Sequence, residues 1–185
     1  MHELYILRHG QTVWNAEGRM QGWGDSPLTP EGEMQAARQY EILRSRDLSA
    51  FDGYCSPSGR AIQTAAIAVA PLLGTVRTDD RLREIGVGDW QGKLRRDLPG
   101  TGDGVDLLLA HYENAPGGEG LERLRDRARA FLDGLVAPAV IVTHGITSRM
   151  IRSLLIGPEV LDLSTPHGGQ GVVWHVKDGV QTLLR

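Results

Sequence analysis

The chain has 185 residues, close to the usual size of one domain and enough to bury a core without disulfide bonds or structural metals. Hydrophobic residues make up 41% of the chain and charged residues 23%, which excludes a mainly disordered or fibrous protein. The net charge of -3 provides no general attraction for nucleic acid or for an anionic membrane, so we expect neither as a partner. We predict one domain over residues 1–185.

Cysteine content and apolar runs both favour a cytoplasmic protein. The single cysteine, Cys55, cannot form a disulfide within the chain, and residues 1–10 lack the long apolar stretch of a secretion signal. The longest apolar run, 65–73, contains Pro71 and is far shorter than the roughly 18 residues that suggest a membrane span. These features predict a chain that spans no membrane, and they leave open whether it forms a homodimer.

The first predicted elements are a strand and a long helix. Residues 4–7 form an apolar run rich in strand formers, and the run stops just before His9. Thr29 and Pro30 then provide an N-cap and a first-turn proline for a helix that we extend to Arg46. The residues of this helix that we expect to face the sheet are Met34, Ala37, Tyr40 and Ile42 or Leu43.

The remaining elements follow the same alternation of strand and helix. A strand is predicted over 51–55, followed by an alanine-rich helix over 60–73 that ends at Gly74. Apolar residues recur at three- and four-residue steps over 121–136, which predicts an amphipathic helix. The last predicted elements are a strand over 139–143 that stops at His144, a helix over 146–156, and a closing β-hairpin of strands 172–176 and 180–184.

This order of elements predicts an α/β fold. Continuous apolar runs are typical of parallel strands that helices cover on both faces. We therefore expect a three-layer sandwich with a mostly parallel central sheet and helices on both faces. Two glycine-containing stretches, 15–28 and 86–118, fit neither pattern, and long irregular segments are usually functional loops. We expect 86–118 to be an insertion that covers the substrate.

Two histidine-glycine pairs mark the candidate site. In open α/β sheets ligands collect outside the carboxyl ends of the strands, so we expect His9 and His144 to meet there. The glycine after each, Gly10 or Gly145, is expected to let the backbone turn sharply and to leave its amide accessible to an anion. A single histidine at a strand end is more often structural than catalytic, so its position alone assigns no role.

Two arginines strengthen the interpretation of the histidine pair. Arg8 precedes His9, and Arg60 opens a helix directly after another predicted strand, so both guanidinium groups are expected at the same edge of the sheet. Such a cluster of cations favours an anionic ligand. Phosphate fits best, because its tetrahedral oxygens match several guanidinium groups through charge-assisted hydrogen bonds.

The motifs themselves resemble a known family. Residues 7–15, LRHGQTVWN, closely resemble the signature of the histidine phosphatase superfamily, also called phosphoglycerate mutase-like. Further matches follow in the family's order and span most of the chain: 21–22 (QG), 27–32 (PLTPEG), 60–65 (RAIQTA), 82–85 (LREI), 90–92 (WQG), 116–119 (PGGE) and 143–145 (THG).

The resemblance implies a role for each candidate residue. His9 would be the nucleophile that takes the phosphoryl group as a phosphohistidine, and Glu84 would donate the proton to the leaving oxygen. The other residues of the implied site are Arg8, Arg60 and His144 around the phosphate, Asn15 as its hydrogen-bond donor, and Gln21, Gly22 and Gly145 in substrate binding. No metal or other cofactor is expected, because the arginines neutralise the phosphoryl oxygens.

Three activities remain open within the resemblance. Phosphoglycerate mutases that resemble this family are generally longer, with added segments that enclose the substrate, whereas this chain has only 86–118 as a cover. We therefore expect a more open pocket, which water can enter. This favours a phosphomonoester hydrolase acting through a phosphohistidine on a small phosphorylated metabolite. The alternatives are phosphoglycerate mutase-type transfer and a non-catalytic module that binds a phosphate ligand. Departures from the commonest family residues leave the substrate open: Gln11, Gly86, Gly120 and Ile146.

Other chemistries are conceivable for the same residues. Asp79 and Asp80 are close enough to Glu84 in the chain to compete for the acid role. Cys55 and Arg60 enclose four residues, one fewer than the phosphate loop of cysteine phosphatases, so we expect Cys55 to be a small apolar residue. A metal site fits by residue type but matches no compact ligand spacing: His9, His144, His167 and Glu84.

Overall fold

The computed structural model describes residues 3–101, 109–163 and 169–185. The strands are β1 Leu4–Arg8, β2 Asp52–Cys55, β3 Arg77–Thr78, β4 Ala139–Thr143, β5 Val173–Lys177 and β6 Val180–Leu184. The α-helices are α1 Val13–Ala16, α2 Pro30–Leu43, α3 Gly59–Ala68, α4 Ala70–Leu73, α5 Leu109–Glu113, α6 Leu121–Asp133 and α7 Gly145–Leu155. Short 3₁₀ helices are η1 Asp80–Leu82, η2 Gly88–Trp90, η3 Arg95–Asp97 and η4 Pro158–Leu161.

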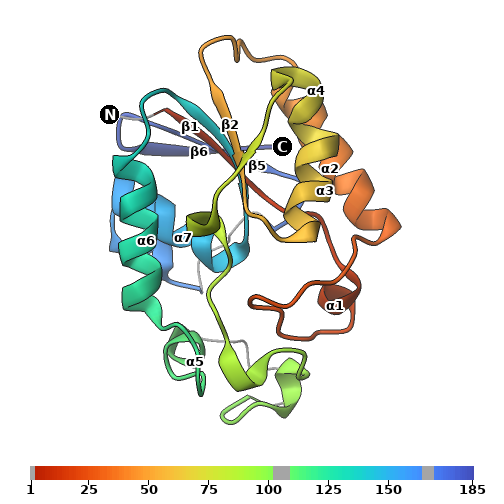
Figure 1. Ribbon diagram of the computed structural model, residues 1–185, viewed down its shortest axis with the longest axis vertical. Coiled ribbons are helices and arrows are strands. Elements are labelled where there is room, and N and C mark those ends of the chain that lie inside the picture. Colours follow the sequence, from red (N-terminus) through yellow and green to blue (C-terminus); the bar gives the residue numbers. More distant parts are fainter. Residues whose placement is uncertain (1–2, 102–108, 164–168) are drawn as a thin grey trace.

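Within the described residues the strands form one six-stranded sheet in the order β3-β2-β4-β1-β5-β6. The pairs from β3 to β1 are parallel, whereas β5 pairs antiparallel with β1 and β6 pairs antiparallel with β5. The predictions of a mostly parallel sheet and of a closing hairpin are confirmed (Figure 1).

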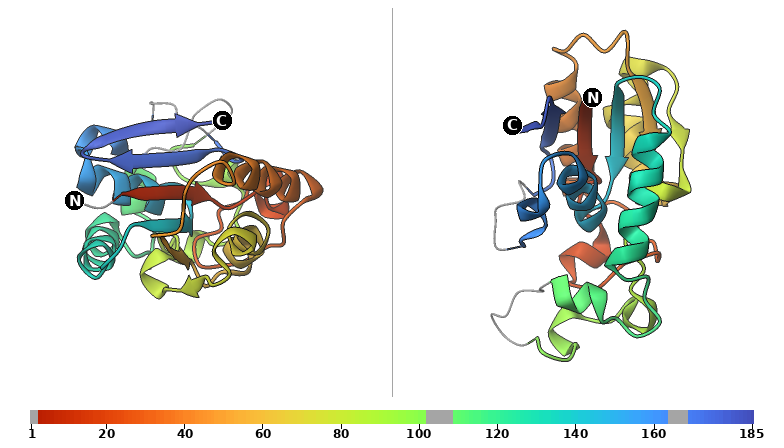
Figure 2. Two further views of the ribbon diagram at one scale, coloured as in Figure 1. Left: turned by 90° about the horizontal axis from the view of Figure 1, so that it is seen from above. Right: turned by 90° about the vertical axis from the view of Figure 1, so that its left-hand side faces the viewer.

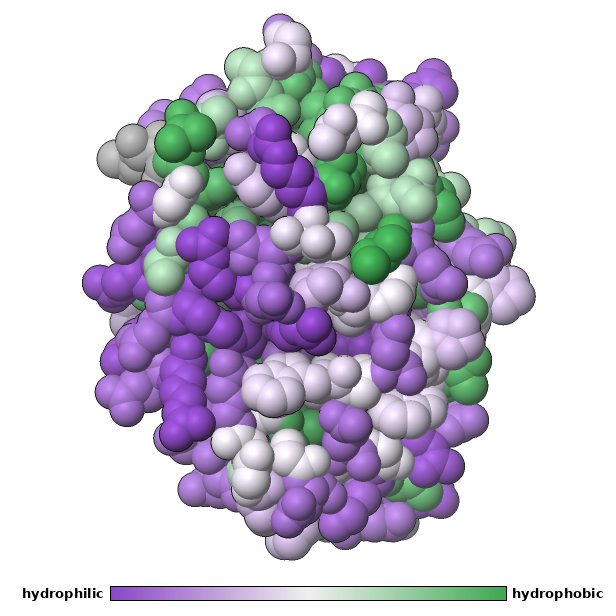
Figure 3. Space-filling model, viewed as in Figure 1, coloured by the Kyte–Doolittle hydropathy of each residue, from purple (hydrophilic) through white to green (hydrophobic). Residues whose placement is uncertain are grey.

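Helices cover the sheet on both faces, as the two further views show (Figure 2). Alternate residues of β1 point to opposite faces: Leu4 and Ile6 join the core under α6 and α7, while Tyr5 and Leu7 join the core under α2 and α3. The predicted three-layer α/β architecture is therefore confirmed. On the outer surface, Figure 3 shows hydrophilic residues across the left and the middle of the face in view, and most of the hydrophobic residues in its upper part.

The predicted sheet-facing stripe of α2 is wrong in part. Met34 is 58% exposed, and Ala37 is exposed as well. The buried residues of this helix are Gly32, Ala36, Gln39 and Leu43. A purely apolar pattern missed this stripe because it contains a glycine and a glutamine, whose amide donates to the carbonyls of Arg8 and Val172. Only Leu43 of the predicted set is fully buried.

The predicted helix over 60–73 is two helices, α3 and α4. The break lies at Val69, which has φ -122° and ψ -45°, and Pro71 follows in the first turn of α4. Proline has no amide hydrogen to continue the ladder of α3. Gly74 caps α4 with φ 72°, as expected from a glycine that ends a helix. Three other predicted helices end earlier than expected, with α2 stopping at Leu43, α6 at Asp133 and α7 at Leu155.

The carboxyl ends of β1, β2 and β4 meet at one edge of the sheet, because these strands are parallel neighbours. Below that edge in Figure 1 lie α1 and the described part of residues 86–118, including α5. None of the helices in the described ranges is long and apolar enough to span a membrane.

Candidate active site

The two histidines that follow β1 and β4 lie side by side. The amide of His9 donates to the carbonyl of Thr143 over 3.0 Å, which ties the end of one strand to the other. The rings of His9 and His144 have centroids 5.1 Å apart and meet at 62°. Both residues are buried, at 3% and 0% exposed. The fold therefore brings the two imidazoles together at the carboxyl edge of the sheet.

Hydrogen bonds fix the position of the ring proton of His9. Nδ1 lies 2.7 Å from the carbonyl oxygen of Gly10, which can only accept, so Nδ1 carries the proton. Nε2 accepts a hydrogen bond from Nε of Arg60 over 3.3 Å. Burial, together with Arg60 and Arg8, holds the pKa of His9 well below its usual value, so the ring is neutral at pH 7. His9 thus presents an unprotonated nitrogen, the form of imidazole that can attack phosphorus.

Arg60 is held rigidly by the loop that precedes α2. Its Nη1 donates to the carbonyl of Gly24 over 2.6 Å and to Asp25 over 3.0 Å, and its Nη2 donates to the carbonyl of Gly22 over 2.9 Å. The residue is 1% exposed. These bonds and the one to His9 fix the plane of the guanidinium group beside Nε2.

Arg8 and Gly145 shape the next part of the site. A Cβ on Gly145 would lie 3.6 Å from the guanidinium of Arg8 and 3.7 Å from Oε2 of Glu84, so only a small residue leaves this space open. Nε of Arg8 is buried and has no hydrogen-bond partner within the described parts of the chain. A buried guanidinium donor without a partner is costly unless an anion satisfies it.

Glu84 is placed by the first turn of α7. Its Oε1 accepts from the amides of Ile85 and Thr147, each over 3.0 Å, and from the Thr147 hydroxyl over 3.0 Å. Its Oε2 accepts from the amide of Ile146 over 3.1 Å. Asp79 and Asp80, the competing acids, instead pair with arginines at 2.6 and 2.8 Å, and of these three acids only Glu84 lines the cavity with His9.

The backbone of Glu84 is fixed from the opposite side. Trp23 donates to its carbonyl over 2.9 Å, and Arg127 of α6 does so over 3.1 Å. Arg127 in turn pairs with Glu119 at 2.6 Å, and Glu119 also accepts from the amide of Gly86 over 3.1 Å. The PGGE motif at 116–119 therefore serves to anchor the loop that carries Glu84.

Asn15 and Gln21 line the side of the cavity formed by α1 and its following loop. Oδ1 of Asn15 accepts from the amide of Thr12 and from the side chain of Gln170, both over 3.2 Å. The side-chain NH₂ of Asn15 is thereby left to donate into the cavity. Gln21 donates to Thr12 over 2.8 Å, and Gly22 lines the same wall.

The expected role of Gly10 is corrected by its surroundings. Its φ is not positive, and its amide donates to the hydroxyl of Thr64 over 3.0 Å, so this amide is not presented to a ligand. The glycine is required for space instead, because a Cβ there would overlap the carbonyl oxygen of Gly32. Of the two glycines, only Gly145 lines the cavity.

Cys55 is buried at the end of a strand, as expected of a small apolar residue there. It is 3% exposed at the end of β2, and burial raises the pKa of its thiol to about 11, so a thiolate is absent at pH 7. Within the parts of the chain that the structure describes, no group of three or more metal-ligating side chains is close enough to hold a metal ion. His167, which the metal hypothesis included, lies outside the described residues.

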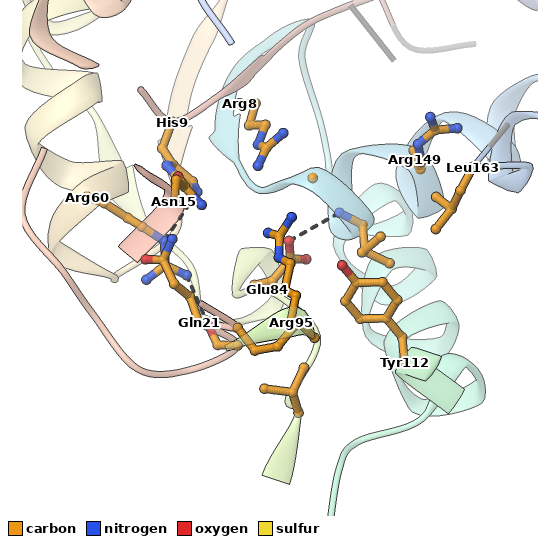
Figure 4. Close-up of a pocket in the computed structure, with 15 residues that line it drawn as sticks. Arg8, His9, Asn15, Gln21, Arg60, Glu84, Arg95, Tyr112, Arg149 and Leu163 are labelled. Atoms are coloured by element: carbon orange, nitrogen blue, oxygen red, sulfur yellow. Dashed lines mark hydrogen bonds between the residues drawn. The ribbon is translucent and has the colours of Figure 1, made fainter. Parts of the chain in front are cut away.

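These residues surround a cavity of about 210 Å³, shown in Figure 4. Arg8, His9, Asn15 and Arg60 lie at one side, and Tyr112, Arg149 and Leu163 lie at the other, with Glu84 and Arg95 between them. Residues of the lining that sequence analysis missed are Met20, Val87, Arg95, Tyr112, Ile146, Arg149 and Leu163.

Helical spacing could have identified one of the missed lining residues, Arg149. Arg149 follows Gly145 by four residues, one helical turn, so the two share a face of α7. Arg95 and Tyr112 fall in the irregular segment 86–118, where no periodicity indicates which side chains face inward.

Comparisons with known proteins agree with this geometry. The family model described as histidine phosphatase superfamily (branch 1) matches residues 4–176. A protein named "Probable phosphoglycerate mutase GpmB" from Salmonella choleraesuis is 34% identical over 174 residues, which cover 85% of this chain and 76% of the relative. The crystal structure of TTHB049 from Thermus thermophilus has a TM-score of 0.76 at 34% identity and covers 99% of both chains.

A likeness of fold alone extends further. A structure described as "a putative alpha-ribazole-5'-P phosphatase" from Escherichia coli K-12 has a TM-score of 0.74 at 23% identity, with 98% of this chain and 94% of the other covered.

The chain belongs to the histidine phosphatase superfamily, a group of phosphatases and mutases, and the resemblance carried by its motifs is confirmed.

Proposed function

We propose that this protein is a phosphomonoester hydrolase that acts on a small phosphorylated metabolite through a phosphohistidine at His9. The observation that carries the proposal is the charge and hydrogen bonding of the cavity. Four arginines and one carboxylate line its described part, and Nε of both Arg8 and Arg95 is a buried donor without a partner in that part of the chain. A phosphate monoester supplies negative charge and oxygen acceptors to such donors.

The first half-reaction transfers the phosphoryl group to the protein. Nε2 of His9 attacks phosphorus, the bond from phosphorus to the ester oxygen breaks, and Glu84 gives its proton to that leaving oxygen. The ring proton stays on Nδ1, where Gly10 holds it. Arg60 and Arg8 neutralise the phosphoryl oxygens during in-line transfer. Oε2 of Glu84, with only the Ile146 amide among its described partners, is the oxygen that carries the proton.

The second half-reaction returns the protein to its starting state. Water attacks the phosphohistidine, and the carboxylate of Glu84 takes the proton that the water loses. The bond between phosphorus and Nε2 breaks, inorganic phosphate leaves, and His9 regains its lone pair. The same carboxyl group therefore acts first as acid and then as base.

The rest of the cavity supports a small substrate. Arg149 and Tyr112 stand across from His9, with Arg95 between, and these three side chains would contact the leaving alcohol. Apolar side chains also line the cavity: Met20, Val87, Ile146 and Leu163. We propose that the segment 86–118, which supplies Arg95 and Tyr112, covers the bound substrate.

A second candidate function is phosphoglycerate mutase-type transfer, in which a second hydroxyl of the substrate takes the phosphoryl group from His9 instead of water. The observation that favours it is the 34% identity to a relative named as a probable phosphoglycerate mutase. Both reactions would use the same residues up to the phosphohistidine.

A substrate panel in ¹⁸O-labelled water separates the two functions. We expect several small phosphate monoesters to release phosphate that contains ¹⁸O, with His9→Ala inactive. Transfer between the two phosphoglycerates, with negligible hydrolysis of every ester, would replace the proposal with the mutase. Binding of esters with no turnover and no phosphohistidine would reduce the protein to a binding module.

A further inference from the structure

Two serines surround one nitrogen of His144. Nε2 lies 2.8 Å from Oγ of Ser56 and 3.1 Å from Oγ of Ser58, and the two hydroxyl oxygens are 2.9 Å apart. All three residues are buried, at 0% exposed for Ser56 and His144 and 9% for Ser58. The three polar atoms thus form a closed triangle away from solvent.

Ser58 contacts His144 instead of capping the helix that it precedes. It is the N-cap residue of α3, where a serine side chain normally accepts from an amide of the first turn, yet it makes no such bond. Pro57, between the two serines, restricts the backbone of this turn, and both hydroxyls lie within hydrogen-bond distance of His144. The serines are therefore placed for His144 rather than for the helix.

A count of hydrogens decides which nitrogen of His144 is protonated. With Nε2 unprotonated, one hydroxyl donates to Nε2 and the second donates to the first, so both hydroxyl hydrogens have acceptors. With Nε2 protonated, the triangle holds three hydrogens and only two acceptors, so one hydroxyl hydrogen is left over. No other acceptor for these hydroxyls is found among the described residues.

We propose that Ser56 and Ser58 are positioning residues that hold His144 as the tautomer with its proton on Nδ1, so that this N–H is available to a phosphoryl oxygen bound at His9. Nδ1 is a buried atom without a partner in the described structure, on a ring that packs against His9. Its hydrogen gains an acceptor when a phosphoryl group arrives, whereas the other tautomer would turn a lone pair toward the anion.

The charge state of the ring is consistent with a single proton. Burial and the neighbouring Arg60, His9, Arg8 and Arg127 hold the pKa of His144 well below its usual value. A neutral ring must choose between two tautomers, so the hydroxyl pair has an effect that it would lack on a doubly protonated ring. The inference rests on the proposed phosphoryl pocket, but it does not depend on whether water or a hydroxyl later takes the phosphoryl group.

Nitrogen NMR of ¹⁵N-histidine-labelled protein, with no substrate present, reads the tautomer directly. We expect the ring of His144 to show a protonated Nδ1 and an unprotonated Nε2 in the wild type and in each single variant, Ser56→Ala and Ser58→Ala, because one hydroxyl still donates to Nε2. In the double variant the preference should be lost. Inorganic phosphate should then bind more weakly, on the order of tenfold.

Ser153→Ala is the matched control, because its hydroxyl donates to the carbonyl of Met150 within α7 and not to His144. It should leave both the tautomer and the phosphate affinity unchanged. A wild-type His144 with its proton on Nε2 would overturn the inference, even if the double variant failed to fold. So would a folded double variant with wild-type tautomer and phosphate affinity. If His144 carries its proton on Nδ1 and the protein binds phosphate but hydrolyses no ester, the hydrolase proposal is contradicted and the inference about His144 stands.

Discussion

Gly10 and Gly32 touch backbone to backbone. A Cβ on Gly10 would overlap the carbonyl oxygen of Gly32, and a Cβ on Gly32 would overlap the carbonyl oxygen of Gln11. The first turn of α2 therefore packs directly on the segment that follows His9. This contact fixes the course of the chain between His9 and Asn15.

Gly10→Ala should destabilise the protein, because the clash is with backbone that cannot rotate away. Overpacking of this kind costs about 1–3 kcal/mol or more, and we expect the upper end. Urea unfolding measures the effect. Gly134→Ala is the control, since its nearest contacts would be at an ordinary 3.4 Å and its φ is -85°. Equal stability of the two variants would show that the close approach of Gly10 is not needed.

Arg60→Ala should lower kcat/KM on the order of 10²–10³, the usual effect of removing one group that stabilises transition-state charge. Arg60→Lys should recover little of this loss, because one ammonium cannot replace a guanidinium that bonds Gly22, Gly24, Asp25 and His9 together. Arg77→Ala is the control, as that side chain is 61% exposed and pairs with Asp52 at the surface. A wild-type rate for Arg60→Ala would exclude this residue from the phosphate site.

Glu84→Gln should affect esters according to their leaving group. An alkyl alkoxide needs a proton as it leaves, whereas a nitrophenolate does not, so the variant should lose far more activity on alkyl esters than on nitrophenyl phosphate. Steady-state rates on both esters give the ratio. Asp80→Asn, at a side chain that is 81% exposed, should leave the ratio unchanged. An equal loss on both esters would assign Glu84 to binding rather than to proton transfer.

The stability of the protein should fall as the pH is lowered from 6.5 to 5.5. Burial and the neighbouring arginines lower the pKa values of His9 and His144 in the folded state, so below 6.5 the unfolded chain takes up protons that the folded chain does not. This contribution is fully present above 6.5 and is lost on acidification, by up to about 1.4 kcal/mol per pH unit for each histidine.

Urea unfolding in phosphate-free buffer at the two pH values measures this slope. His9→Asn should reduce it, because one of the two buried imidazoles is gone. The opposite sign, with a wild type that becomes more stable on acidification, would mean that the histidines are charged in the folded protein.

Much of the site could be predicted because its residues sit at strand ends. His9 and His144 follow two apolar runs, and the carboxyl ends of parallel neighbours must share an edge of the sheet. Arg60 follows β2 in the same way. The motif order of the family then distinguished Glu84 from Asp79 and Asp80, which local composition could not do.

What could not be predicted depends on contacts between distant segments. The inward face of α2 is set by Gln39, a polar residue that is buried only because the carbonyls of Arg8 and Val172 need donors there. Arg95 and Tyr112 line the cavity from an irregular segment, and irregular backbone has no period that assigns a side chain to one face. The partners of His144, Ser56 and Ser58, are likewise separated from it by more than 80 residues.

The most direct test is to locate the phosphoryl group on the protein during turnover. Wild-type protein is mixed with a hydrolysed ester, quenched in alkali because phosphohistidine is acid-labile, and digested for mass spectrometry. We expect phosphate on His9 in the wild type and in the control variant His175→Ala. His175 lies in β5, and its imidazole forms a hydrogen bond with Glu3. We expect none in His9→Ala, which should remain folded but inactive. A phosphoryl group on another residue, or normal turnover by His9→Ala, would contradict the mechanism.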